Sequence, residues 1–186
     1  MDIVEQIRAF VPTCQQEERE KPQMLEFLRR NEDAFSRNNE TAHMTASAWV
    51  ISPDGQKVVM CYHNLYRSWS WCGGHADGEK DLLAVALREV KEETGLTAHP
   101  LQEGICSLEI LPVQGHMKHG KWVTSHLHMN VTYLLQAEGS DLRVKQDENS
   151  AVVWMTPEEA LARSAEPWMV ARVYVKLVRA AQPYMR

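Results

Sequence analysis

Three glutamates, Glu89, Glu92 and Glu93, fall within little more than one helical turn. Like charges three or four residues apart on a helix repel one another, so this arrangement predicts a bound cation that neutralises them. Carboxylate oxygens favour Mg²⁺ or Mn²⁺ over softer metals. Such an ion binds phosphate oxygens and lowers the pKa of a coordinated water. The residues therefore predict metal-dependent hydrolysis at phosphorus.

A helix has to carry these carboxylates. Asp81 can cap its N-terminus, residues 82–93 contain neither Gly nor Pro, and Gly95 suits a left-handed C-cap. At about 100° per residue, one face is apolar and the glutamates lie on another. The apolar face comprises Leu83, Ala86, Leu87 and Val90.

The segment 74–96 resembles the Nudix box of the Nudix hydrolases, Gly-x5-Glu-x7-Arg-Glu-U-x-Glu-Glu-x-Gly-U, where U is aliphatic. The first glutamate of the box is replaced by Lys80, which lies between Glu79 and Asp81. The other fixed positions match: Gly74, Arg88, Glu89, Val90, Glu92, Glu93, Gly95 and Leu96.

The resemblance extends over roughly residues 42–186 and implies an α/β fold, the Nudix-type α/β/α sandwich with a mixed β-sheet. We expect a Nudix hydrolase domain at 41–186, preceded by an N-terminal helical extension at 1–40. The spacing of apolar residues predicts a helix that ends before Pro12 and a second that begins at Pro22. This extension would pack on the domain or across a homodimer.

Hydrophobic runs predict strands, and a final helix is expected at 168–181. The expected strands are 44–51, 57–63, 69–71, 101–113, 122–136 and 151–155.

The resemblance also implies roles for individual residues. Glu89 and Glu93 would be the main metal ligands, Glu92 would hold a second ion or its water, and the carbonyl of Gly73 would complete the site. Arg88 would pair with a box glutamate and orient it. A surface arginine without this role is the alternative.

A general base outside the box is common in the family. Glu148 is our candidate, with Asp147 as the alternative, in the polar loop 144–150 before the last expected strand. Loops are rich in acids, so neither assignment follows from the pattern alone.

Histidines form a second group of interest. His126 and His128 share one face of an expected strand with Asn130. A His-x-His pair can bind zinc, but no third ligand has a readable spacing. We therefore expect these histidines to face a substrate cleft. Lys118, in a glycine-flanked basic segment, would approach a phosphate or a base, or would lie at a solvated hairpin tip.

Trp69 and Trp71 alternate with serines on the approach to the box. Their rings would belong to the core or would stack on a nucleobase, with Arg67 nearby as a further substrate contact.

Composition narrows the range of possible functions. The 186 residues are 44% hydrophobic, and the formal charge of −5 argues against nucleic acid as the main partner. No membrane segment or signal peptide is apparent. The four cysteines form no Cys-x-x-Cys pair, which indicates reduced thiols and a cytoplasmic location.

The sequence therefore predicts a Nudix hydrolase that uses Mg²⁺ or Mn²⁺ as cofactor. It would cleave a phosphoanhydride bond in a nucleoside diphosphate linked to another moiety. A non-catalytic nucleotide-sensing Nudix domain is an alternative, with Lys80 as its only hint. An isopentenyl diphosphate isomerase-like enzyme is another, because Cys72 is followed by Gly73, Gly74 and His75.

Overall fold

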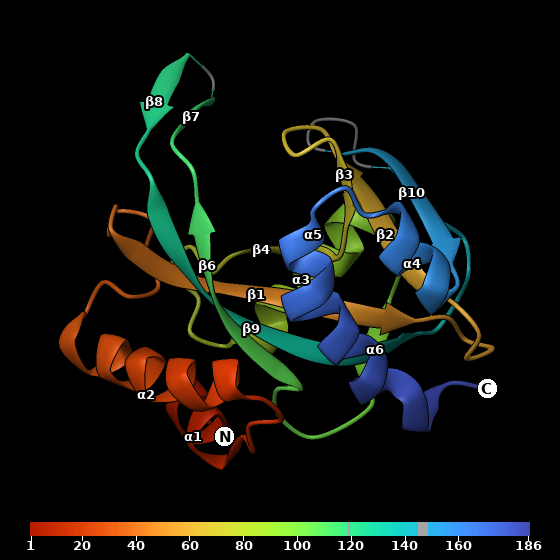
Figure 1. Ribbon diagram of the computed structural model, residues 1–186, viewed down its shortest axis with the longest axis horizontal. Helices are drawn as coiled ribbons and strands as arrows, with labels where there is room; N and C mark the ends of the chain where they lie inside the picture. The colour runs from red at the N-terminus through yellow and green to blue at the C-terminus, as the bar shows by residue number, and fades with distance from the viewer. Residues whose placement is uncertain (119, 145–148) are drawn as a thin grey trace.

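The computed structural model describes residues 1–118, 120–144 and 149–186. Its main sheet consists of β1 (Ala42–Ile51), β2 (Val58–His63), β3 (Ser68–Ser70), β4 (Cys72–His75), β5 (Ala98–Pro100), β6 (Ser107–Val113), β9 (His126–Ala137) and β10 (Asn149–Met155). A hairpin of β7 (His116–Lys118) and β8 (Lys121–Val123) projects from the body of the molecule (Figure 1).

The centre of the sheet is the parallel pair β1 and β9. Around it the strands follow the order β10-β2-β1-β9-β5, with β3 on β2, β4 on β1 and β6 on β9. Every other pairing is antiparallel, so the sheet is mixed, as expected.

Helices cover both faces of the sheet. On one face, α3 (Leu82–Thr94) shares a hydrophobic core with α1 (Ile3–Ala9) and α2 (Gln15–Arg30). On the other face lie α4 (Pro157–Arg163), α5 (Pro167–Met169), the π-helical turn η1 (Val170–Tyr174), α6 (Val175–Ala181) and the 3₁₀ turn η2 (Gln182–Tyr184). In Figure 1 the C-terminal helices α5 and α6 cross in front of the sheet. The predicted α/β/α sandwich with an N-terminal helical extension is confirmed.

The box helix α3 forms where its sequence signals place it. The Asp81 carboxylate accepts hydrogen bonds from the backbone N–H groups of Leu83 and Ala84, both at 3.1 Å. Gly95 ends the helix with a φ of 76°, a conformation that glycine adopts without strain.

The second helix does not begin at Pro22, as expected, but at Gln15. Its first turn is fixed by Glu17, whose carboxylate accepts hydrogen bonds from the backbone and side chain of Thr13 and from Lys176 of α6. These tertiary contacts outweigh the local effect of a proline inside the helix.

Three other expected elements are shortened or interrupted. The run 101–113 is a strand only from Ser107, because residues 101–106 form bends with Gly104 at a φ of 74°. The run 122–136 is split between β8 and β9, and the C-terminal helix contains the π-helical turn η1.

The first two helices belong to the same core as the sheet, through Ile3, Ile7, Phe10 and Met24. The division into an extension at 1–40 and a domain at 41–186 remains a proposal. Among the described residues, no helix combines the length and apolar character that a membrane span requires.

Candidate active site

Glu93 joins the box helix to two strands. It is only 5% exposed. Its Oε2 accepts a hydrogen bond from the backbone N–H of Gly73 at 2.9 Å, and its Oε1 accepts one from Nδ2 of Asn149 at 2.8 Å. Through this carboxylate, α3 is tied to β4 and to the first residue of β10.

Glu89 lies directly against Gly74. A Cβ on Gly74 would be 2.5 Å from the carboxylate carbon of Glu89, so a larger residue would displace this side chain. The Glu89 side chain is 13% exposed. Glycine at the start of the box is therefore required by the close approach of the Glu89 carboxylate to β4.

Arg88 contacts both of its acidic neighbours on the helix. Its guanidinium donates to Oε1 of Glu89 at 3.1 Å and to the backbone carbonyl of His75 at 3.2 Å. Its Nε lies 3.9 Å from Oε1 of Glu92, which is the most exposed of the three box carboxylates at 46%. Arg88 can thus orient Glu89 while leaving Glu92 accessible.

Cys72, the residue that resembles the isomerase cysteine, is buried beneath this site. The sulfur atoms of Cys61 and Cys72 lie 3.7 Å apart. The hydrogen bond with Cys61, burial, and the nearby Glu93 and Glu89 carboxylates all raise the pKa of the Cys72 thiol. A thiol held in its neutral form is a poor nucleophile, so the surroundings of Cys72 do not favour the isomerase.

The tryptophans before the box belong to the second core. Trp71 is 8% exposed and packs edge-on against Tyr174, with ring centroids 5.7 Å apart. Trp69 contacts the same core and lies under the guanidinium of Arg163, 4.8 Å from its ring centroid. Arg67 is exposed in the turn before β3, with a φ of 49°. The geometry favours core packing over stacking on a nucleobase.

The two candidates for the general base, Glu148 and Asp147, lie outside the described residues. The next residue, Asn149, is the hydrogen-bond partner of Glu93. Sequence analysis missed this partner because nothing in the spacing of β10 and α3 indicates that they meet.

The histidines of β9 lie apart from the box carboxylates. His126 and His128 gather with His43 of β1 and His75 of β4. Burial, reinforced by neighbouring charges, lowers the pKa of His75 to about 3 and that of His128 to about 2. His43 was missed because its proximity depends on the β1–β9 register, which places it opposite His128. Lys118 is exposed on the projecting hairpin.

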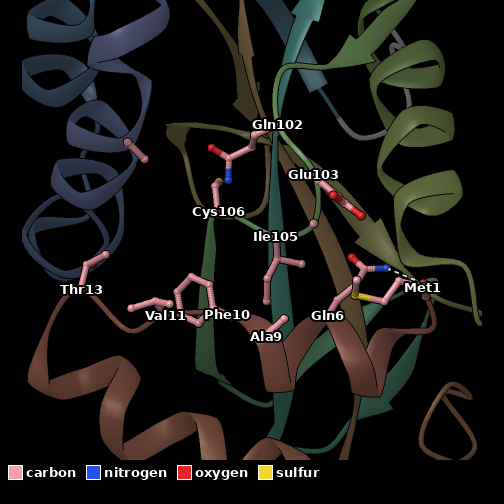
Figure 2. A pocket seen from close by; sticks show the side chains of 12 residues that line it. Met1, Gln6, Ala9, Phe10, Val11, Thr13, Gln102, Glu103, Ile105 and Cys106 are labelled. Carbon is pink, nitrogen blue, oxygen red and sulfur yellow. Dashed lines mark hydrogen bonds between the residues drawn. The ribbon is translucent and has the colours of Figure 1, made fainter.

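A separate pocket of about 440 Å³ lies between α1, the β5–β6 connection and Ala180 (Figure 2). Its lining includes Phe10, Val11, Ile105 and Cys106, and no carboxylate of the box. The pocket therefore has no direct role in phosphate chemistry at α3.

A sequence model described as the NUDIX domain matches residues 41–176. The chain belongs to the Nudix hydrolase family. The match covers the sheet, the box and the C-terminal helices as far as the start of α6, which agrees with the resemblance of residues 74–96. Comparison with curated proteins finds no match.

Solved structures of Nudix-fold proteins resemble this Nudix chain. A Caenorhabditis elegans Ap4A hydrolase is 19% identical, with a TM-score of 0.55, and the match covers 76% of this chain and 98% of that one. An Escherichia coli dihydroneopterin triphosphate pyrophosphohydrolase is 19% identical, with a TM-score of 0.52 and coverage of 73% and 94%. A Streptococcus suis ADP-ribose pyrophosphatase is 16% identical, with a TM-score of 0.51 and coverage of 75% and 90%. These similarities establish the fold.

In this Nudix box, the unusual Lys80 is exposed. Its neighbour Glu79 accepts a hydrogen bond from the backbone N–H of Asp81 at 2.8 Å, and Asp81 caps α3. The loop is thus supported by acidic side chains on either side of the lysine.

Proposed function

We propose that this Nudix hydrolase cleaves a phosphoanhydride bond in a nucleoside diphosphate linked to another moiety. The observation that supports it is the contact of two box carboxylates with the glycines of β4, Glu93 at Gly73 and Glu89 at Gly74, with Glu92 on the same helix beside Arg88. A site of this kind binds the diphosphate, which is the part that such substrates share.

The donor set fits a hard divalent cation. Glu89 is partly exposed and Glu92 largely exposed on α3, Glu93 is held beside them, and a carboxylate oxygen can accept more than one bond. Glu89, Glu93 and Glu92, with the carbonyl of Gly73, would hold Mg²⁺ or Mn²⁺. When bound, this ion would supply charge neutralisation for the diphosphate and a water of lowered pKa.

The protein's own residues position this chemistry. Glu93 holds β4 and β10 at the box helix, while Arg88 holds Glu89 through its guanidinium. We propose Glu148 as the general base that accepts the proton of the attacking water, with Asp147 as the alternative. Both precede Asn149, which anchors the start of β10 at Glu93.

Hydrolysis of a substrate panel tests the function. The panel comprises ADP-ribose, NADH, nucleotide sugars, dinucleoside polyphosphates, capped-RNA analogues and oxidised dNTPs, each assayed with Mg²⁺ and with Mn²⁺. We expect one class to be cleaved in the presence of either metal and none after addition of EDTA. Reaction in ¹⁸O-labelled water, followed by mass spectrometry of the products, shows which phosphorus is attacked.

Glu92→Gln serves as the inactive variant and Glu40→Gln as its matched control, because Glu40 is exposed and lies outside the box. Hydrolysis that survives Glu92→Gln would come from a contaminant or from another site. Tight binding of a panel member without hydrolysis would instead support the nucleotide-sensing alternative.

Other properties remain predictions of the sequence. A cytoplasmic location rests on the cysteine pattern, and a homodimer is one role for the N-terminal helices. A small nucleotide derivative, rather than nucleic acid, is the proposed partner.

A further inference from the structure

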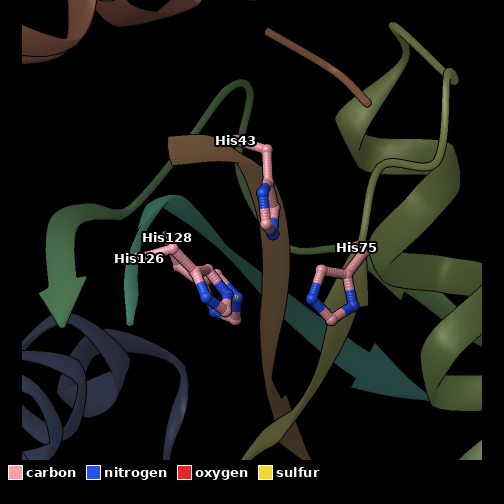
Figure 3. Close-up of side chains that lie close together, drawn as sticks. All are labelled: His43, His75, His126 and His128. Atoms are coloured by element: carbon pink, nitrogen blue, oxygen red, sulfur yellow. Dashed lines mark hydrogen bonds between the residues drawn. The ribbon is translucent and has the colours of Figure 1, made fainter. Parts of the chain in front are cut away.

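Four histidines from three strands meet on the side of β4 that faces away from α3 (Figure 3). His43 lies on β1, His75 on β4, and His126 and His128 lie on β9. Each offers one ring nitrogen, and these four nitrogens all lie within 4.8 Å of one another. The ring centroids of neighbouring pairs are 4.9–5.2 Å apart.

The backbone already orients two of the rings. Nδ1 of His43 lies 3.0 Å from the carbonyl of Asn39, and Nδ1 of His126 lies 2.8 Å from the carbonyl of Thr124. Because a carbonyl only accepts, each Nδ1 carries the proton and each Nε2 keeps its lone pair, which in His126 faces Nε2 of His128. Metal-binding histidines are commonly held in this way, by a backbone carbonyl on the nitrogen that faces away from the ion.

One of these lone pairs has no protein partner. His43 is 4% exposed, and its Nε2 makes no hydrogen bond within the described part of the chain. A buried polar atom without a partner destabilises the fold, and a bound cation would relieve this cost. The Nε2 atoms of His126 and His128 lie 3.2 Å apart. A tetrahedral Zn²⁺ with Zn–N bonds of about 2.0–2.1 Å holds its nitrogens about 3.3 Å apart.

We propose that His43, His75, His126 and His128 bind one Zn²⁺ ion in a closed, tetrahedral structural site. Imidazole nitrogens suit Zn²⁺ and disfavour the Mg²⁺ that carboxylates prefer. A site with four protein ligands leaves no position for a catalytic water, so its role is structural. The ion would fasten β1, β4 and β9 together where β4 leads into the box.

This site is separate from the carboxylates. Successive residues of a strand point to opposite faces, so His75 lies on the other side of β4 from Gly74, which contacts Glu89. One link between the two sites passes through the backbone, because the carbonyl of His75 accepts a hydrogen bond from Arg88. The zinc proposal therefore does not depend on the proposed hydrolysis.

Metal titrations of the untagged, chelator-treated protein test the proposal. We expect about one Zn²⁺ per chain by calorimetry, and a visible spectrum typical of tetrahedral Co²⁺ when Co²⁺ replaces it. His126→Gln, at a half-buried position, should weaken Zn²⁺ binding at least about 100-fold. The matched control His99→Gln changes an exposed histidine and should leave the affinity unchanged.

A second measurement needs no variant. Zn²⁺ should protect His126 and His128 from carbethoxylation by diethyl pyrocarbonate, mapped by mass spectrometry, while His99 reacts equally with and without the ion. The proposal is overturned if wild-type protein binds no Zn²⁺, if Co²⁺ gives an octahedral spectrum, or if protection is absent. Zn²⁺ binding lost in Glu92→Gln but kept in His126→Gln would overturn it as well.

Discussion

Asn149 donates a hydrogen bond from Nδ2 to Oε1 of Glu93 at 2.8 Å, and thereby joins the start of β10 to the last turn of α3. The other oxygen of the same carboxylate accepts from the N–H of Gly73. Glu93 is thus a structural support as well as a proposed metal ligand, whereas Glu92 is exposed. The two roles can be separated by experiment.

Glu93→Gln should lower both turnover and stability. Both carboxylate oxygens face N–H donors, so the amide of glutamine places its NH₂ against one of them. We expect the free energy of unfolding to fall by about 1–3 kcal/mol and turnover to fall at least about 100-fold. Glu92→Gln should lower turnover with a stability change within about 0.5 kcal/mol. Urea denaturation measures the stability of each variant, and steady-state kinetics measure its turnover. Equal stability of the two variants would contradict the bracing role of Glu93.

Gly74→Ala should impair the active site without unfolding the protein. The new methyl group would occupy the place of the Glu89 carboxylate, which lies at the end of a flexible side chain and can move. We expect weaker activation by Mg²⁺ and at least about a tenfold loss of kcat/KM, equal to about 1.4 kcal/mol. Gly139→Ala is the control, because nothing lies within 4 Å of its Cβ. If Gly74→Ala keeps full activity, Glu89 is not positioned by this contact.

Lys80→Glu restores the family residue at an exposed position. Glu79 and Asp81 already support the loop and cap α3, so the change should alter activity less than about tenfold, under about 1.4 kcal/mol in transition-state terms. The change in activity is measured as the steady-state rate with Mg²⁺ on the best substrate of the panel. Activity that appears only in Lys80→Glu would mean that the natural chain is a nucleotide sensor.

Lys176→Met should destabilise the fold strongly. The Lys176 ammonium lies 3.0 Å from carboxylate oxygens of both Glu17 and Glu109, and these two side chains are 1% and 0% exposed. Burial alone would lower the pKa of Lys176, but these two carboxylates outweigh it and raise the pKa. Removing the ammonium leaves buried carboxylates without their cation, which costs about 3–5 kcal/mol.

Chemical denaturation at neutral pH compares Lys176→Met with Lys57→Met, which removes an exposed lysine and should change stability within about 0.5 kcal/mol. A loss of similar size in both variants would show that Lys176 does not stabilise the fold through Glu17 of α2.

The box and its helix could be predicted from sequence because their signals are local. Asp81, Gly95 and the apolar stripe determine α3, and the spacing of the glutamates places them on one helix face. The mixed sheet and helical layers followed from the family resemblance and are confirmed. The predicted start of α2 at Pro22 was wrong because Glu17 binds Lys176, a residue 159 positions away.

The sequence by itself determined the box helix, its three carboxylates and the family, since each depends on residues within a few turns of one another. Only the tertiary structure decided that Glu93 braces β4 and β10, and that His126 and His128 meet His43 and His75. These contacts depend on strand register, because the pairing of β1 with β9 and with β4 places distant residues side by side. A shift of one residue would turn each histidine to the opposite face of the sheet.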